Sequence, residues 1–190
     1  MERYIFKLYY ASFLATILLF FNPVESLTNM KQAEIINLRK FQTSDLPQIY
    51  QLYYDTIHCV NAADYTQEQL NAWAPQLTPE IENRWQNSLQ QNITYVATID
   101  EQIVGFADMS HAGYLDRLFV HKDFQGKGIA KNLYNALELE AKELDLMAIT
   151  TESSITAKPF FLKQNFIIIN EQQKEYKGIY FTNYLMSKKI

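Results

Sequence analysis

The sequence predicts an α/β domain, and three observations support this class. Segments with strand periodicity alternate with segments of helical periodicity along most of the chain. The 190 residues are 48% hydrophobic and 14% aromatic, which suits one globular domain with a substantial core. Near the middle of the chain, an apolar run at residues 115–120 leads through a glycine-bearing loop into a strongly periodic helix.

Local signals define the predicted elements in chain order. Thr43-Ser44-Asp45 starts the first helix, with Pro47 in the first turn, where a missing N–H is tolerated. Residues 64–90 form two short helices, because Ala74-Pro75 breaks the pattern and Thr78-Pro79-Glu80 restarts it. Later helices are predicted from Gly128 to Leu144 and over residues 157–165. The predicted strands are residues 35–41, 94–99, 103–108, 114–120, 147–152, 166–170 and 179–186.

The loop at residues 125–130, Gln-Gly-Lys-Gly-Ile-Ala, has the features of an anion site. Glycines allow close approach of the backbone, and the free N–H groups of a first helical turn point at negative charge. The loop lacks the spacing of a Walker P-loop, since no Ser or Thr follows Lys127. It also lacks the third glycine of a Rossmann fingerprint. An ordinary strand–turn–helix unit remains the alternative interpretation.

The pattern Gln-x-x-Gly-x-Ala at Gln125, Gly128 and Ala130 resembles motif A of the Gcn5-related N-acetyltransferase (GNAT) family. Residues 96–97 and 103–107 resemble the hairpin that precedes motif A, and residues 159–166 resemble motif B. The resemblance covers residues 36–187 and implies the GNAT acyl-CoA N-acyltransferase fold, a mixed central β-sheet with helices on both faces. Within the family, the chain is similar to a YafP-like bacterial subgroup at residues 64–66, 69–70, 72–75 and 116–120.

The family resemblance implies acetyl-CoA as co-substrate and an amine of a small molecule or protein as acceptor. Backbone groups of the strand would hold the pantetheine arm, and the loop would hold the pyrophosphate. Lys127 either adds positive charge near phosphate or is a solvated loop lysine. The implied cofactor-binding residues are Leu118, Phe119, Val120, Gln125, Gly126, Lys127, Gly128, Ile129, Ala130 and Phe161.

Amine acetylation needs a route for the amine proton and an acid for the thiolate. Asp116, in an otherwise apolar strand, is the candidate catalytic base; a structural ion pair with a nearby arginine is the alternative. Asp108 is a weaker candidate. Many members of the family have a tyrosine in motif B that can act as the acid, but Phe161 occupies that position here. Tyr65, Tyr180 or water would then supply the proton, and Phe160 and Phe161 would line the CoA channel.

The segment between the first helix and the hairpin is expected to select the substrate. His58, Tyr65 and Trp73 are the candidate substrate-binding residues, and Trp85 adds to the aromatic content of this segment. The alternative is that these aromatic residues pack short helices onto the sheet, and that His58 is a packed or capping residue. The formal net charge of −4 mildly favours a cationic or amine substrate.

Composition argues against several other classes. The isoelectric point of 5.4 and the absence of a basic cluster argue against nucleic acid as the main partner. The single cysteine, Cys59, excludes an internal disulfide framework, and no cysteine–histidine spacing suggests a metal site. The sequence leaves open whether the chain forms a homodimer.

The first 29 residues form a hydrophobic leader with three interpretations. Arg3 and Lys7 precede an apolar run at residues 8–21, which is short for a membrane span and resembles a secretory signal or a short anchor. Alternatively, Met30 is the true start. An enzyme that uses acetyl-CoA is expected to be cytoplasmic, whereas export or anchoring through residues 1–26 would favour an interaction protein.

Three functional hypotheses therefore follow from the sequence: an N-acetyltransferase, a non-catalytic CoA-binding module, and an exported or anchored protein that uses the fold for interaction.

Overall fold

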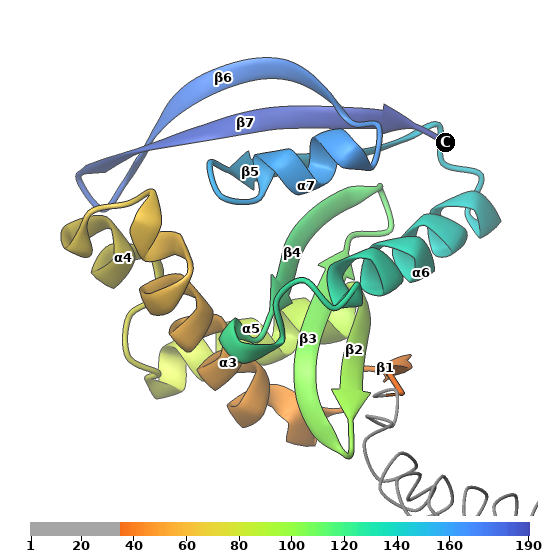
Figure 1. Ribbon diagram of the computed structural model, residues 1–190, viewed down its shortest axis with the longest axis horizontal. Helices are drawn as coiled ribbons and strands as arrows, with labels where there is room; N and C mark the ends of the chain where they lie inside the picture. Colours follow the sequence, from red (N-terminus) through yellow and green to blue (C-terminus); the bar gives the residue numbers. More distant parts are fainter. Residues whose placement is uncertain (1–34) are drawn as a thin grey trace, which may run out of the picture. The chain divides into compact units, whose positions relative to one another are not determined.

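A seven-stranded mixed sheet organises residues 35–190, the part of the chain that the computed structural model describes (Figure 1). The strand order is β1-β2-β3-β4-β5-β7-β6. The strands are β1 (Asn37–Lys40), β2 (Ile93–Ile99), β3 (Gln102–Met109), β4 (Tyr114–Val120), β5 (Ala148–Ser154), β6 (Ile167–Tyr176) and β7 (Ile179–Lys189). The helices are α3 (Leu46–Cys59), α4 (Gln67–Trp73), α5 (Pro79–Gln91), α6 (Ile129–Glu143) and α7 (Lys158–Lys163). The predicted leader, residues 1–29, lies outside the described residues.

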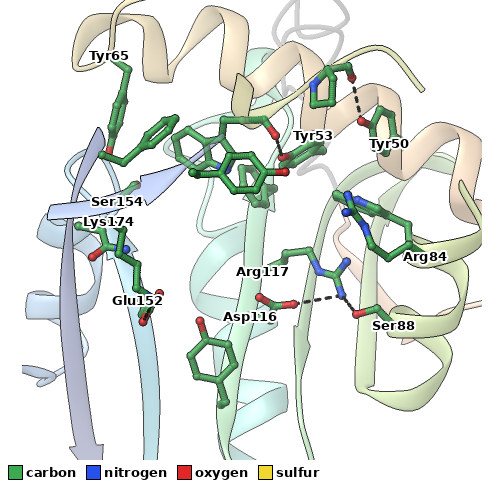
Figure 2. Close-up of a pocket in the computed structure, with 18 of the residues that line it drawn as sticks. Tyr50, Tyr53, Tyr65, Arg84, Ser88, Asp116, Arg117, Glu152, Ser154 and Lys174 are labelled. Carbon is green, nitrogen blue, oxygen red and sulfur yellow. Dashed lines mark hydrogen bonds and ion pairs between the residues drawn. The ribbon is translucent and has the colours of Figure 1, made fainter. Parts of the chain in front are cut away.

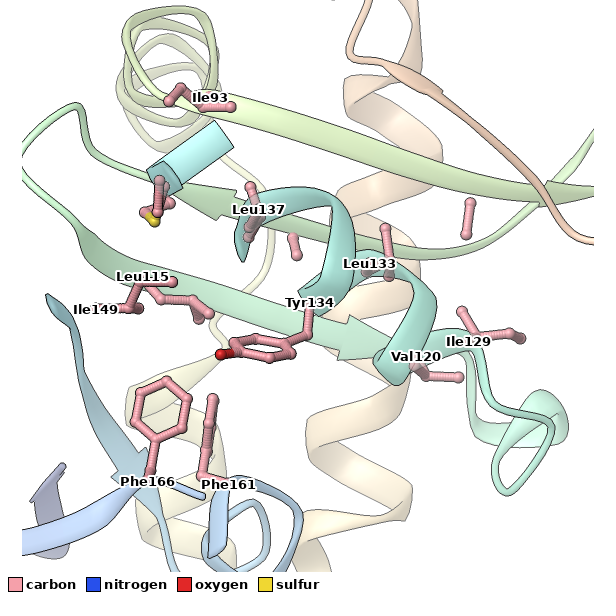
Figure 3. Close-up of a cluster of buried hydrophobic side chains, with 14 of the residues drawn as sticks. Ile93, Leu115, Val120, Ile129, Leu133, Tyr134, Leu137, Ile149, Phe161 and Phe166 are labelled. Carbon is pink, nitrogen blue, oxygen red and sulfur yellow. The ribbon is translucent and has the colours of Figure 1, made fainter. Parts of the chain in front are cut away.

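Helices cover both faces of the sheet, as predicted, because β2 and β3 alternate their apolar side chains between two cores. One core places α6 against Ala97 and Ala107, and the other places α3 and α5 against Val96 and Phe106. Figure 3 shows Leu133, Tyr134 and Leu137 of α6 among the buried side chains of the first core. The α/β mixed-sheet fold is therefore confirmed.

Gly105 of β3 lets α6 approach the sheet closely. A Cβ atom at this position would lie 2.8 Å from a methyl group of Ile129 and 3.1 Å from Leu133. Ile129 is the first residue of α6, so this contact fixes where the helix begins above β3. The start of α6 and the loop before it are thus held against the central strands.

The longest difference from the predicted elements is in β6. The sequence predicts a strand at residues 166–170, whereas β6 continues to Tyr176. Its second half is polar and shows no buried face, because β6 is an edge strand that is largely exposed. Pairing with β7, from Ile167↔Ser187 to Tyr176↔Ile179, holds this segment in extended form. Hydrophobic periodicity carries no signal for a strand of this kind.

Within residues 35–190, no helix combines the length and the apolar character needed to cross a membrane. In the same part of the chain, no three histidine, cysteine or carboxylate side chains gather as a metal site would require.

Candidate active site

A wedge opens in the sheet between β4 and β5. These parallel strands pair only at Tyr114↔Thr150 and Leu115↔Thr151, and the Thr151 hydroxyl donates to the Leu115 carbonyl at 2.8 Å. Beyond this point β4 stays paired with β3, while β5 stays paired with β7. A register shift at Asp108/Met109 in the β3–β4 ladder marks the same region, and such bulges bend a strand. The facing edges of β4 and β5 are therefore available to a ligand.

The wedge leads into a cavity of about 410 Å³, which we call the cofactor cavity. Nine of the ten residues implied as cofactor-binding line it. Lys127 is the exception, and its ammonium group lies 4.7 Å from the centre of the Phe124 ring. The nine are Leu118, Phe119, Val120, Gln125, Gly126, Gly128, Ile129, Ala130 and Phe161.

The glycine loop leaves room for a ligand beside the start of α6. Gly126 and Gly128 have φ angles of +76° and +82°, which side chains disfavour, and no atom lies within 4 Å of where a Cβ would be. Gly128 is the N-cap residue and provides no side chain to cap the first turn. N–H groups at such a helix start are donors for an anion. Gln125 fixes the loop, since its amide donates to the Val120 carbonyl at 2.6 Å.

A second cavity, of about 590 Å³, lies on the other side of the wedge; we call it the acceptor cavity (Figure 2). Of the predicted substrate-binding residues, Tyr65 and Trp73 line it and His58 does not. His58 Nε2 lies 3.1 Å from the Ala74 carbonyl oxygen, and its ring packs on Tyr54 at 4.3 Å between centroids. The structure therefore gives His58 a packing environment outside both cavities.

Five residues line both cavities: Trp73, Asp116, Phe119, Glu152 and Ser154. Asp116 comes from β4, and Glu152 and Ser154 come from β5, so the two edges of the wedge contribute to this junction. A thioester in the cofactor cavity and an amine in the acceptor cavity would meet at this junction. Asp116, the candidate base from the sequence, thus lies at this junction.

Asp116 and Asp108 differ in how they interact with Arg117. Arg117 donates to both carboxylate oxygens of Asp108 at 2.7 Å, and its Nη2 also donates to the Ser88 hydroxyl at 2.6 Å. Asp108 is fully buried and also accepts from Asn92 at 2.6 Å. The nearest Asp116 oxygen lies 3.5 Å from Arg117 Nη2. The short, buried ion pair is therefore formed by Asp108, and Asp116 makes the longer contact.

The environment of Asp116 raises the pKa of its carboxyl group. Partial desolvation in the cavity is the main cause, and the negative charges of Asp108 and Glu152 add to it, against the opposing effect of Arg117. Burial alone would lower the pKa of Arg117, but the hydrogen bonds and charge of Asp108 outweigh it and raise that pKa. Arg117 is therefore a permanent cation in the wall of the acceptor cavity.

Comparison with known proteins decides the family. Residues 61–188 match the family model described as an acetyltransferase (GNAT) domain. The chain belongs to the GNAT family. It is also 34% identical over 155 residues to YafP of Escherichia coli strain K12, which is described as an uncharacterized N-acetyltransferase. That match covers 81% of this chain and 96% of YafP, so the YafP-like resemblance is confirmed and the chain is an N-acetyltransferase of this family.

Solved structures share the GNAT fold. A GCN5-related N-acetyltransferase from Rhodopseudomonas palustris gives a TM-score of 0.77 at 27% identity, over 81% of this chain and 95% of the other. The PaiA N-acetyltransferase of Thermoplasma acidophilum, solved in complex with coenzyme A, gives a TM-score of 0.64 at 18% identity, over 82% and 99% of the two chains. At that identity the second likeness shows the fold alone.

The tyrosines of this GNAT domain are placed away from the cofactor cavity. Among the described residues, no tyrosine lines that cavity, and Phe161 packs its ring at 5.3 Å from Phe160 and 5.1 Å from Phe166. The Tyr65 hydroxyl accepts from the Ile155 N–H at 2.9 Å and donates to the Thr182 carbonyl at 3.3 Å. Tyr180 is 61% exposed and lines neither cavity. Neither of the two tyrosines named as acids from the sequence therefore faces the cofactor cavity.

Several residues of the GNAT site have no clear signal in the sequence. Tyr114 lines the acceptor cavity, where burial, Glu152 and Asp116 raise its pKa to about 12. Its position two residues before Asp116 on one strand could have pointed to a shared face. Arg84, Glu152 and Lys174 also line this cavity, but they come from three separate elements. Only the tertiary fold brings them together.

Proposed function

We propose that the protein transfers the acetyl group of acetyl-CoA directly to a primary amine of a small molecule or protein. The observation that carries this proposal is the junction at Asp116, where a cavity next to a glycine loop meets a second, aromatic cavity. The coenzyme A bound to the PaiA relative and the acetyl-CoA bound to YncA of Salmonella typhimurium support the choice of cofactor.

The residues present fit acetyl-CoA. The pyrophosphate would bind at the N–H groups of residues 126–130, beside the two open glycines. The pantetheine arm would follow the free edge of β4 at Leu118–Val120 toward the junction. Phe160 and Phe161 supply an apolar wall for this arm. When bound, the cofactor supplies the activated acetyl group.

The chain's own residues would then handle one proton at each end of the transfer. The amine nitrogen attacks the thioester carbonyl carbon, and Asp116 takes the proton that the nitrogen loses, directly or through water. The carbon–sulfur bond breaks, and the sulfur leaves as a thiolate. Ser154 is the one hydroxyl-bearing residue of the described chain that lines both cavities. We assign the protonation of the thiolate to water, with Ser154 to orient it.

Placement of the activity inside the cell is part of the same proposal, because acetyl-CoA is a metabolite of that compartment. The predicted GNAT domain at residues 36–187 then acts without the leader at residues 1–29. Mass analysis of the mature N-terminus tests this point. A chain that begins at Met30 or retains the leader in the cytoplasmic fraction supports it, whereas a processed chain outside the cell contradicts it.

The activity is tested by incubating the full chain with acetyl-CoA and a panel of primary amines, with detection of the released thiol and mass analysis of the products. We expect thiol release that requires an amine and yields the acetylated amine. A non-catalytic CoA-binding module, suggested by Phe161, would instead bind acetyl-CoA in calorimetry and acetylate no amine.

A further inference from the structure

The charge balance of the acceptor cavity differs from that of the whole chain. The chain carries a net charge of −4, but the described cavity wall holds three cations, Arg84, Arg117 and Lys174, and two carboxylates, Asp116 and Glu152. With the buried Asp108 included, the charges cancel. A cavity for a polycation would have an excess of carboxylates. The expectation of a simply cationic substrate therefore does not follow from the local charges.

Two of the three cations are already paired. Arg117 uses Nε and Nη2 on Asp108 and Ser88, and Lys174 donates to both carboxylate oxygens of Glu152. Arg84 is exposed and has no hydrogen bond or ion pair in the described part of the chain. Asp116 retains only its 3.5 Å contact with Arg117. One carboxylate and one guanidinium thus remain for a ligand.

Ser88 and Arg117 connect the Arg84 guanidinium group to the Asp116 carboxylate. Arg84 lies four residues before Ser88, so both share one face of α5 with about 6 Å between their Cβ atoms. Ser88 contacts the Arg117 nitrogen that lies 3.5 Å from Asp116. In Figure 2, Asp116 and Arg117 are drawn between the Glu152–Lys174 pair and the Arg84–Ser88 face. Arg84 and Asp116 are therefore connected along the cavity wall by one turn of α5 and by the Ser88–Arg117–Asp116 contacts.

Aromatic rings line the wall beside these two groups. The ring of Tyr53 lies 4.6 Å from Trp85 and 5.0 Å from Phe119, and all three line the acceptor cavity. Burial raises the pKa values of Tyr50 and Tyr53, and the positive charge of Arg84 partly offsets this rise. The Arg84 guanidinium group is therefore close enough to interact electrostatically with both hydroxyl groups. A flat apolar body between the charged ends would pack on this wall.

We propose that the acceptor is a primary amine with an aromatic body and a distant carboxylate, its nitrogen at Asp116 and its carboxylate at Arg84. This inference rests on the proposed function and names its substrate class. A guanidinium binds a carboxylate through two parallel hydrogen bonds, which gives both affinity and orientation. The carboxylate at Arg84 directs the amine toward the thioester.

Three amines test the inference with the full chain: 2-phenylethylamine, 4-(2-aminoethyl)benzoate and spermidine. We expect the wild-type kcat/KM to be about tenfold higher for the carboxylate-bearing amine than for 2-phenylethylamine. Arg84→Gln raises KM for the carboxylate-bearing amine, so that its preference over 2-phenylethylamine is lost. Lys163→Gln, at an exposed lysine that lines neither cavity, keeps the preference.

Failure of the inference differs from failure of the proposed function. Equal turnover of the two aromatic amines, faster turnover of spermidine, or an Arg84→Gln loss shared by both aromatic amines would overturn the inference while acetylation itself stands. If no amine is acetylated, the proposed function fails, and calorimetric titration of 4-(2-aminoethyl)benzoate decides the inference. Binding that Arg84→Gln weakens about tenfold supports the inference, and equal or absent binding overturns it.

Discussion

The two cavities that meet at Asp116 are built in different ways. Most of the predicted cofactor-binding residues come from one continuous segment, residues 118–130, which joins the end of β4 to the start of α6. The acceptor cavity draws its wall from α3, α4, α5, β4, β5, β6 and β7. A ligand common to a family needs only a local backbone geometry, whereas acceptor selection depends on side chains that the whole fold assembles.

The cavities also differ in their electrostatics. The cofactor cavity offers the N–H groups of a helix start beside open glycines, and such donors suit phosphate without a dedicated cation. The acceptor cavity contains opposed charges, most of them paired, on an aromatic wall. Cofactor binding should therefore respond to loop geometry, and acceptor turnover should respond to single charges.

The largest effect is expected for Gly128→Glu. The substitution places bulk and negative charge where the pyrophosphate would bind, so acetyl-CoA affinity should fall by at least about a hundredfold in calorimetry. Gly178→Glu is the matched control, because Gly178 has a φ of +79° and equally open surroundings in the β6–β7 turn. Equal loss of affinity in both variants would show that backbone strain, rather than the site, is responsible.

Asp116→Asn should lower kcat/KM for a primary amine by about a hundredfold at neutral pH, with acetyl-CoA affinity unchanged. Because the Asp116 pKa is raised, wild-type kcat/KM should fall on the acid side at a higher pH than an ordinary aspartate would give, and Asp116→Asn should lack this limb. Asp100→Asn, in the exposed β2–β3 turn, serves as the control. Unchanged turnover in Asp116→Asn would remove Asp116 from the mechanism.

The raised pKa of Asp116 also makes the folding stability of the chain depend on pH. The unfolded chain ionises this group at its ordinary pKa near 3.8, before the folded chain does. Relative to Asp116→Asn, the wild type should therefore lose stability as the pH rises from that value through the folded pKa. Chemical denaturation at a series of pH values measures the difference, and a gain in stability over this range would contradict the assigned direction.

The smallest effects concern two lysines of the loop and helix start. Lys131 lines the cofactor cavity and Lys127 does not. Lys131→Gln should weaken acetyl-CoA binding by about threefold, whereas Lys127→Gln should change it by less than about twofold. The two calorimetric affinities, compared at low and high salt, check this order. A larger loss in Lys127→Gln would restore the alternative that this lysine neutralises phosphate.

The sequence predicts the cofactor cavity more completely than the acceptor cavity. Element order, the glycine loop and the position of Asp116 follow from periodicity, glycine chemistry and one acid in an apolar strand, which are local signals. His58 illustrates the limit, because its place at the end of α3 is predictable but its packing on Tyr54 outside the cavities is not. That Arg117 pairs more closely with Asp108 than with Asp116 depends on strand register, which no local pattern specifies.

A structure of the full chain with coenzyme A bound would test the central claim most directly. We predict that the pyrophosphate contacts the N–H groups of residues 126–130, that the pantetheine arm lies between β4 and β5, and that the thiol ends beside Asp116. A cofactor bound in any other place, or a thiol remote from the acceptor cavity, would contradict the account.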